Sequence, residues 1–291
     1  MAKEITAEMV FEQLLARKAD SHKGSFGHLM CVCGSSRYRG AAALAAEGAL
    51  RMGAGLVTLA GIDPVINSVS ARLPECIFLP CKQSSQGGIS SQSGRLILES
   101  TRGCSCLLLG PGLTDSEDTL SLVQLLVPGA GCGVVLDADG INAAARLDEL
   151  PKPIDFPLIL TPHPGEMARL CGLTVAEVQA GRESIAASYA RSQGCVVVLK
   201  GHHTIIAGPD GQVFKCLAGN PGLARGGSGD ILAGMTAALL TQGLDPLWAA
   251  VCAVWLHASA ADQCSARLSQ LAMLPHDIFF DLCRILAQNN R

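Results

Sequence analysis

Aromatic and charged residues are scarce in this chain of 291 residues. Phenylalanine, tryptophan and tyrosine together make up 4% of it, and the four charged residue types make up 16%. The net charge is −3, without a basic patch or a long run of like charges, which argues against a nucleic-acid partner. No apolar run reaches transmembrane length, so we expect no membrane partner.

Several common site motifs are also missing. The thirteen cysteines include no Cys-x-x-Cys pair, which disfavours a zinc site. No Walker A sequence occurs, and no G-x-G-x-x-G follows an expected strand, so the usual nucleotide signatures are absent. Residues 1–24 lack the apolar core of a signal peptide. We therefore interpret the cysteines as small core side chains in a reducing cytoplasm.

The apolar content predicts a layered α/β fold. Hydrophobic residues make up 49% of the chain, and short apolar runs alternate with amphipathic ones. Expected strands cover residues 28–33, 56–61, 76–81, 106–110, 133–138, 158–162 and 195–201, with a hairpin over 204–215. Expected helices cover 40–53, 118–127, 165–172, 174–194 and stretches near 229–242, 246–264 and 276–288, and 82–94 is expected to be a surface loop. We predict a single domain over 1–291, with a central, mainly parallel sheet and helices on both faces.

A glycine-rich stretch, GNPGLARGGSGD at 219–230, precedes an expected helix. Glycines let a ligand approach the backbone, and a helix N-terminus presents free N–H groups and partial positive charge. Gly226, Gly227, Ser228 and Gly229 are therefore predicted to form an anion site suited to phosphate. Asp230 follows in the first helical turn, where it is either a functional carboxylate or only a favourable N-terminal helix residue.

Other polar residues follow expected strands, where ligands of parallel sheets collect. Lys200 ends an apolar strand, so it either binds a phosphate that offsets its burial or extends to solvent. His163 and Glu166 lie three residues apart at an expected strand-to-helix turn. Either His163 contacts a ligand and Glu166 holds a metal-bound water, or, equally, the two form a helix-capping pair. Asp137 and Asp139 either bind magnesium or, in the case of Asp139, cap a helix.

Six stretches, in this order, carry a family resemblance: HKGSFGHLMCVCGSSRYRGAAALAAEGALRMGAGLVTLA, LLLGPGL, LDADGIN, LTPHPGEMARL, VVLKGHHTII and NPGLARGGSGDILAGMTAALL. They resemble the ADP/ATP-dependent NAD(P)H-hydrate dehydratases, the carbohydrate-kinase-like group of the ribokinase-like fold. The likeness runs from about Ser21 to Asp277. It implies repair of hydrated NADH or NADPH at the expense of ADP or ATP, with Mg²⁺, in a cytoplasmic homotetramer. The N-terminal epimerase domain common in the family is not expected here, because the motifs begin so early.

The resemblance also assigns roles to residues. It implies that the nucleotide is bound by Lys200, Gly201, His202, His203, Thr204 and Gly229, and the hydrate by Ala41, Gly112, His163 and Asp230. Asp230 is implied to take the proton from the hydrate hydroxyl, and Glu166 is our candidate for holding magnesium through water. Two positions depart from the family: Ser228 replaces a common threonine, and residues 257–262 lack a glycine often found there.

Two other functions share these residues. A small-molecule kinase of the same fold, acting on a vitamin precursor or sugar alcohol, would also use Asp230 and the glycine loop, but His163 stands where such kinases have asparagine. A non-catalytic nucleotide sensor would need no base at Asp230.

Overall fold

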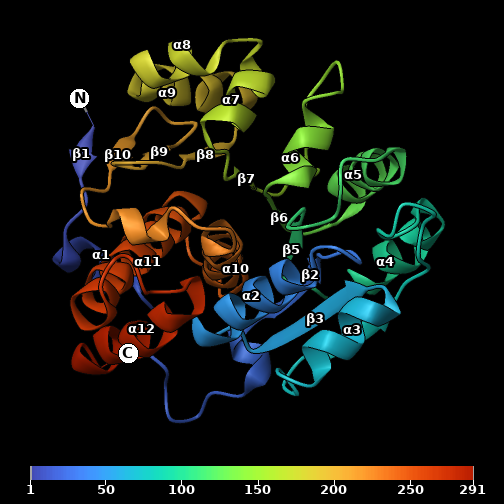
Figure 1. The fold of residues 1–291 in the computed structure, drawn as a ribbon, viewed down its shortest axis with the longest axis horizontal. Coiled ribbons are helices and arrows are strands. Elements are labelled where there is room, and N and C mark those ends of the chain that lie inside the picture. The colour runs from blue at the N-terminus through green and yellow to red at the C-terminus, as the bar shows by residue number, and fades with distance from the viewer. Residues whose placement is uncertain (1, 291) are drawn as a thin grey trace.

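A computed structural model describes residues 2–290, which form one ten-stranded sheet in the order β1-β10-β9-β8-β7-β6-β5-β2-β3-β4 (Figure 1). The strands are β1 (Lys3–Glu4), β2 (His28–Val32), β3 (Leu56–Gly61), β4 (Ile77–Pro80), β5 (Cys106–Leu109), β6 (Gly133–Leu136), β7 (Leu158–Leu160), β8 (Val196–Leu199), β9 (Ile205–Ala207) and β10 (Val213–Lys215). Only β9 pairs antiparallel with its neighbours, β8 and β10. The predicted strands, the hairpin and the mainly parallel sheet are thus confirmed.

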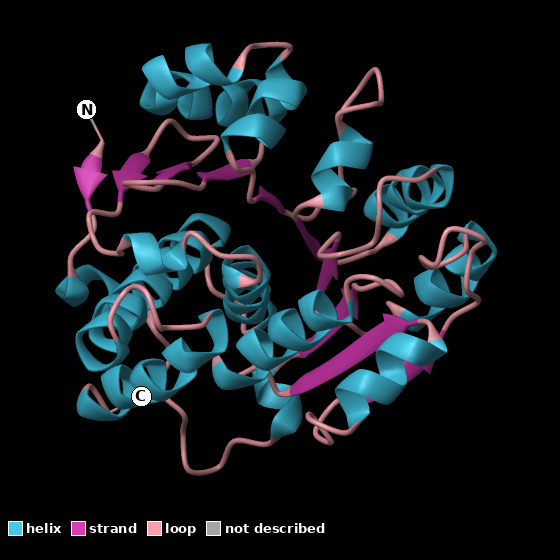
Figure 2. Ribbon diagram, viewed as in Figure 1, coloured by secondary structure: helices cyan, strands magenta, loops and turns pink. Residues whose placement is uncertain are grey.

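Helices cover both faces of the sheet, as predicted (Figure 2). They are α1 (Ala7–Gln13), α2 (Arg39–Arg51), α3 (Asp63–Ser70), α4 (Gly94–Ser100), α5 (Glu117–Gly129), α6 (Asp139–Ala144), α7 (Pro164–Cys171), α8 (Val175–Ala180), α9 (Arg182–Gln193), α10 (Ser228–Thr241), α11 (Pro246–Leu268) and α12 (Ile278–Gln288). Figure 1 shows α2, α10 and α11 on one face and α5 to α9 on the other. Strands β5, β6 and β8 are accordingly buried throughout.

Two sequence predictions need correction. The single helix expected over 174–194 is divided at Gly181, whose dihedral angles (φ −125°, ψ 33°) end α8 before α9 begins. Thr174 and Glu177 form a capping box at the start of α8. Residues 82–94 are not simply a surface loop, because Ile89 is buried and pairs with Gln83 in a β-bridge. This segment closes over the core beside α4.

The cysteines occupy the positions expected of core residues. All thirteen are free thiols, and eleven are buried. Burial raises the pKa of Cys76 and Cys132 to about 12, so both stay protonated. Among the described residues, no helix is both long and apolar enough to cross a membrane.

Glycines allow α2 and α10 to pack backbone to backbone. A Cβ at Gly234 of α10 would lie 2.0 Å from the Ala45 carbonyl oxygen of α2, and a Cβ at Gly48 would lie 2.7 Å from the Ile231 carbonyl oxygen. This close approach places the start of α10 beside α2. It therefore helps to position the glycine-rich stretch, whose Gly229 lies next to Lys200, directly after β8.

Candidate active site

The stretch predicted to bind phosphate, Gly226 to Gly229, is called the phosphate loop below, and it runs into the start of α10. Gly227 is the N-cap with φ 103°, a left-handed conformation that favours glycine, and α10 begins at Ser228. Gly226 has no heavy atom within 4 Å of the position a Cβ would take. The backbone N–H groups of the first helical turn are thus presented beside open space, as anion binding requires.

A cavity of about 680 Å³ borders this loop. The predicted site residues that line it are His163, Lys200, Gly201, His202, His203, Thr204, Gly226, Gly227, Ser228 and Gly229. The rings of His202 and His203 stack with centroids 3.7 Å apart. The structure thus brings the residues assigned to the nucleotide together around one space of a size suited to a small ligand. Ala41, Gly112, Glu166 and Asp230 do not line it.

Lys200 has protein partners for its charge. Its Nζ lies 2.6 Å from Asp137 Oδ1 and 3.9 Å from Glu166 Oε2. Burial lowers the pKa of Lys200, but Asp137 and Glu166 outweigh burial and raise it overall. Two carboxylates therefore already offset the burial of this charge, and the proposed contact of Lys200 with phosphate stays a prediction. The ammonium group also lies 3.4 Å from the position of a Cβ at Gly229, next to the phosphate loop.

His163 and Glu166 form the capping box at the start of α7. His163 Nδ1 accepts hydrogen bonds from the N–H groups of Gly165 and Glu166, and Glu166 Oε2 accepts one from the His163 N–H. The capping interpretation is thus confirmed. Burial raises the pKa of Glu166 to about 7, with Lys200 opposing the shift. A buried carboxyl with this pKa can also exchange a proton near neutrality, so capping does not preclude a further role.

Asp230 lies in the first turn of α10, and its acidity is strongly changed. Burial, together with the Asp137 carboxylate, raises its pKa to about 6, and the Lys200 ammonium opposes the shift. A carboxylate with this pKa is a better proton acceptor than an exposed aspartate, yet it is mostly ionised at neutral pH. The pKa of Asp230 would therefore suit a general base.

Asp139 does not cap α6. The N-cap of that helix is Ala138, and Asp139 Oδ2 instead accepts a hydrogen bond from the Thr114 N–H. Burial raises the pKa of Asp139. This carboxylate therefore ties the loop after β5 to the start of α6, and the capping alternative is wrong.

Ala41 and Gly112 meet beyond the carboxyl ends of β2 and β5, two neighbouring strands. The chain adds β3 and β4 on one side of this pair and β6 to β10 on the other, so the strand order reverses here. Gly112 has φ 65°, and a Cβ there would lie 2.8 Å from Ala41 Cβ and 2.7 Å from Tyr38 Cβ. The adjoining loops are joined by a hydrogen bond from the Gly34 N–H to the Pro111 carbonyl. Gly112 is therefore required for the approach of α2, whether or not a ligand also contacts it.

Two site residues were not assigned from the sequence. Asp137 was considered only as a possible magnesium ligand, whereas it contacts Lys200 and also accepts a hydrogen bond from Thr161 Oγ1 at 2.7 Å. Its position directly after a buried strand was the available signal. His257 lines the cavity from α11, and the apolar sequence of that helix gave no signal for it.

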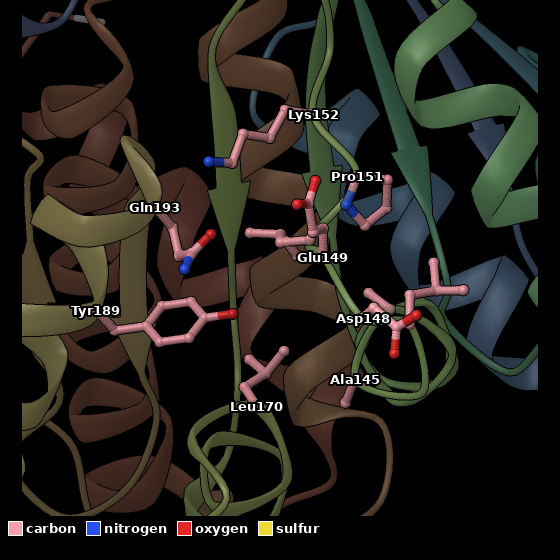
Figure 3. Close-up of a pocket in the computed structure, with 11 residues that line it drawn as sticks. Ala145, Asp148, Glu149, Pro151, Lys152, Leu170, Tyr189 and Gln193 are labelled. Carbon is pink, nitrogen blue, oxygen red and sulfur yellow. The ribbon is translucent and has the colours of Figure 1, made fainter.

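A second cavity of about 800 Å³ lies away from this site (Figure 3). It is bounded by the segment between α6 and β7, including Glu149 and Lys152, and by Tyr189 and Gln193 of α9. That segment leads into the amino end of β7, at the edge of the sheet opposite the phosphate loop. None of the predicted site residues lines this cavity.

The architecture and the position of the site define an α/β protein of the ribokinase-like class. A structure of a ribokinase-like superfamily protein from Enterococcus faecalis superposes with a TM-score of 0.83 at 24% identity, covering 99% of this chain and 96% of that one. Residues 29–284 also match the NAD(P)H-hydrate dehydratase family model. The chain belongs to that family.

Relatives extend the comparison over nearly the whole chain. A crystal structure of an ADP/ATP-dependent NAD(P)H-hydrate dehydratase from Bacillus subtilis, co-crystallised with ATP and Mg²⁺, matches with a TM-score of 0.85 at 33% identity over 99% of each chain. A bifunctional NAD(P)H-hydrate repair enzyme from Moorella thermoacetica is 41% identical over 94% of this chain and 52% of its own length. The chain spans about half the length of such bifunctional relatives.

Proposed function

We propose that this chain dehydrates the 6-hydroxy hydrate of NADH or NADPH, consuming ADP or ATP. The observation that carries the proposal is Asp230, half-buried in the first turn of α10 with its pKa raised to about 6, directly after the glycine loop. A base and an anion site in this order suit transfer of a phosphoryl group to a hydroxyl. Membership of the dehydratase family supports the hydrate as the hydroxyl compound.

The residues suggest a sequence of steps. The phosphate loop, Gly226 to Gly229, holds the terminal phosphoryl group through backbone N–H groups. Asp230 takes the proton from the 6-hydroxyl as its oxygen attacks the terminal phosphorus, and the bond to the departing nucleotide breaks. The ring nitrogen then expels phosphate by breaking the C6–O bond. Loss of a proton from C5 restores the dihydropyridine, so the products are NADH or NADPH, phosphate and AMP or ADP.

Nucleotide binding is assigned to the cavity beside this loop. We place the nucleotide against Lys200, Gly201, His202, His203 and Thr204, with its terminal phosphate at Gly229. We place the hydrate between Ala41, Gly112, His163 and Asp230. The position of Ala41 and Gly112 where strand order reverses supports this, because ligands of open α/β sheets bind there.

We propose that this site binds Mg²⁺ together with the phosphate groups of the nucleotide. No cluster of three or more metal-binding side chains exists within residues 2–290. Mg²⁺ commonly uses one or two carboxylates and completes its shell with water and phosphate oxygens. Glu166 would hold it through water, since Asp137 is occupied by Lys200. When bound, the ion would neutralise charge on the phosphate oxygens.

We further propose that ADP is preferred, that the chain forms a homotetramer, and that it works in the cytoplasm. Thirteen free thiols suit a reducing compartment. Sedimentation equilibrium measures the assembly directly, and a monomeric mass would contradict the tetramer.

The decisive experiment supplies hydrated NADH, magnesium and either ADP or ATP, and follows the absorbance of the restored dihydropyridine. We expect dehydration with both nucleotides, faster with ADP. Unchanged hydrate together with phosphorylation of a vitamin-precursor alcohol would establish the kinase alternative. Nucleotide binding with no turnover of either compound would indicate a sensor.

A further inference from the structure

Two buried polar atoms beside the phosphate loop have no hydrogen-bond partner among residues 2–290. They are the hydroxyl oxygen of Ser228 and Nε2 of His257. Both residues line the proposed nucleotide cavity, and both are buried. Buried polar atoms are rarely left without a partner, because losing water without a replacement costs about 1–3 kcal/mol. The pair therefore points to a partner that arrives with a ligand.

The two residues come from helices that pack against each other. Ser228 is the first residue of α10, and His257 lies within α11. Burial, with a smaller contribution from the Lys200 ammonium, lowers the pKa of His257 to about 4, and a hydrogen bond with the Ser228 backbone opposes the shift. The imidazole is therefore neutral at pH 7 and has one N–H donor and one acceptor nitrogen.

The chemistry of a phosphoryl group determines how both atoms can be satisfied. Phosphoryl oxygens accept hydrogen bonds, so the Ser228 hydroxyl must donate to them. A hydroxyl that donates in this way can still accept, and a protonated Nε2 of His257 supplies the donor. A chain from imidazole to hydroxyl to phosphoryl oxygen gives a partner to both of these atoms, and each bond strengthens the next by polarisation.

We propose that His257 is a positioning residue that acts through Ser228, with its Nε2–H donating to the Ser228 hydroxyl when that hydroxyl donates to the terminal phosphoryl group of the nucleotide. This extends the proposed function, on which its catalytic part rests. His257 itself does not touch the transferred group. It orients the hydroxyl and holds the first turn of α10 against α11.

The test compares His257→Leu, His257→Gln and His257→Asn. Leucine fills the space without a donor, and we expect ADP affinity to fall about tenfold, as for one lost hydrogen bond of about 1.4 kcal/mol. AMP affinity should not change, because AMP lacks the terminal phosphoryl group. Glutamine can place an N–H near Nε2 and should recover most of the loss, whereas asparagine is too short to do so.

A double-mutant cycle shows whether Ser228 is the intermediary. In a Ser228→Ala background, His257→Leu should change ADP affinity less than twofold, since the chain is already broken. Cys264→Ala is the matched control, because Cys264 is buried on α11 seven residues further on, away from Ser228. Equal losses of ADP and AMP affinity, additive effects with Ser228→Ala, or the same loss in Cys264→Ala would overturn the proposal. Calorimetric binding does not depend on dehydration, so failure of the proposed function would leave this test valid.

Discussion

Three carboxylates, Asp137, Glu166 and Asp230, lie around the single ammonium group of Lys200 at the carboxyl edge of the sheet. Asp137 and Glu166 are buried and Asp230 is half-buried, so most of their charge is removed from water. Burial, together with the negative charge of Asp137, raises the pKa of Glu166 and Asp230, and the Lys200 ammonium opposes both shifts. At the residue scale, these carboxylates can exchange protons near neutral pH, as the proposed mechanism requires.

Replacing Asp230 with asparagine should nearly abolish turnover. Asparagine keeps the shape but cannot accept the hydroxyl proton, and general-base catalysis contributes about 10²–10⁴ in rate. Nucleotide affinity should hold or rise slightly, because one negative charge near the phosphates is removed. Steady-state kinetics and calorimetry measure both. Turnover within a few-fold of the parent would remove Asp230 from the role of base.

The rate and the stability should depend on pH in opposite ways. The base must be ionised, so kcat/KM should rise with pH up to about 6 and then level off. Raised carboxyl pKa values mean that the folded chain holds protons more tightly than the unfolded chain. Their stabilising contribution is full below the ordinary carboxyl pKa and is lost as pH rises through about 6 for Asp230 and about 7 for Glu166. Urea denaturation at several pH values, with Asp230→Asn as the control, measures this loss.

Replacing Lys200 with methionine should affect both folding and binding. The Asp137 carboxylate would remain buried without its cation, which typically costs about 3–5 kcal/mol. Nucleotide affinity should fall more than hydrate affinity, because a charged hydrogen bond contributes about 1.5–3 kcal/mol. Adding Asp137→Asn should recover part of the stability but not the nucleotide affinity. Unchanged nucleotide affinity in the single variant would place Lys200 outside the binding site.

At the scale of elements, the packing of α2 on α10 determines where the phosphate loop lies. Leu44 of α2 contacts the loop so closely that a Cβ at Gly227 would lie 2.5 Å from Leu44 Cδ1. The same face of α2 continues to Ala41 at the hydrate side. A shift of one helix would therefore move both proposed binding sites relative to each other.

The close helix contact predicts a large effect of one methyl group. Gly234→Ala should destabilise the protein by about 1–3 kcal/mol or more, because the new Cβ would clash with the Ala45 carbonyl. Gly40→Ala is the control: it lies in α2, nothing stands within 4 Å, and stability should rise by up to about 1 kcal/mol. Chemical denaturation of the two variants gives the comparison. Similar stabilities would show that the helices separate at little cost.

At the scale of the whole molecule, one sheet connects the first described strand to the C-terminal third. Strand β1 pairs with β10, and Phe11 of α1 contacts Trp255 of α11 with ring centroids 5.9 Å apart. The N-terminal segment is therefore part of the same core as the site. This continuity supports the prediction of a single domain over 1–291.

A single domain should unfold in one transition. The only two tryptophans, Trp248 and Trp255, lie in α11 near β10 and α1, whereas far-UV circular dichroism reports on all helices. We expect the two signals to coincide in urea, with a common midpoint. A midpoint for fluorescence that differs from that for dichroism would show that the two ends of the sheet unfold separately.

Local patterns in the sequence determined the order of strands and helices, the parallel sheet and the glycine loop before α10. These features depend on neighbouring residues: apolar runs form buried strands, and glycines before an amphipathic helix expose its N-terminus. Asp230 could be named for the same reason, since its position in the first turn follows from the chain alone.

Only the tertiary structure decided which groups act on one another. Lys200 is paired with Asp137, 63 residues earlier, and His257 lies beside Ser228 from a different helix. The tolerance for a side chain at Gly234 depends on Ala45, and the burial of Ile89 depends on the core it covers. Charge pairing, burial and contact act over a few ångströms in space, whatever the separation along the chain, so no local pattern encodes them.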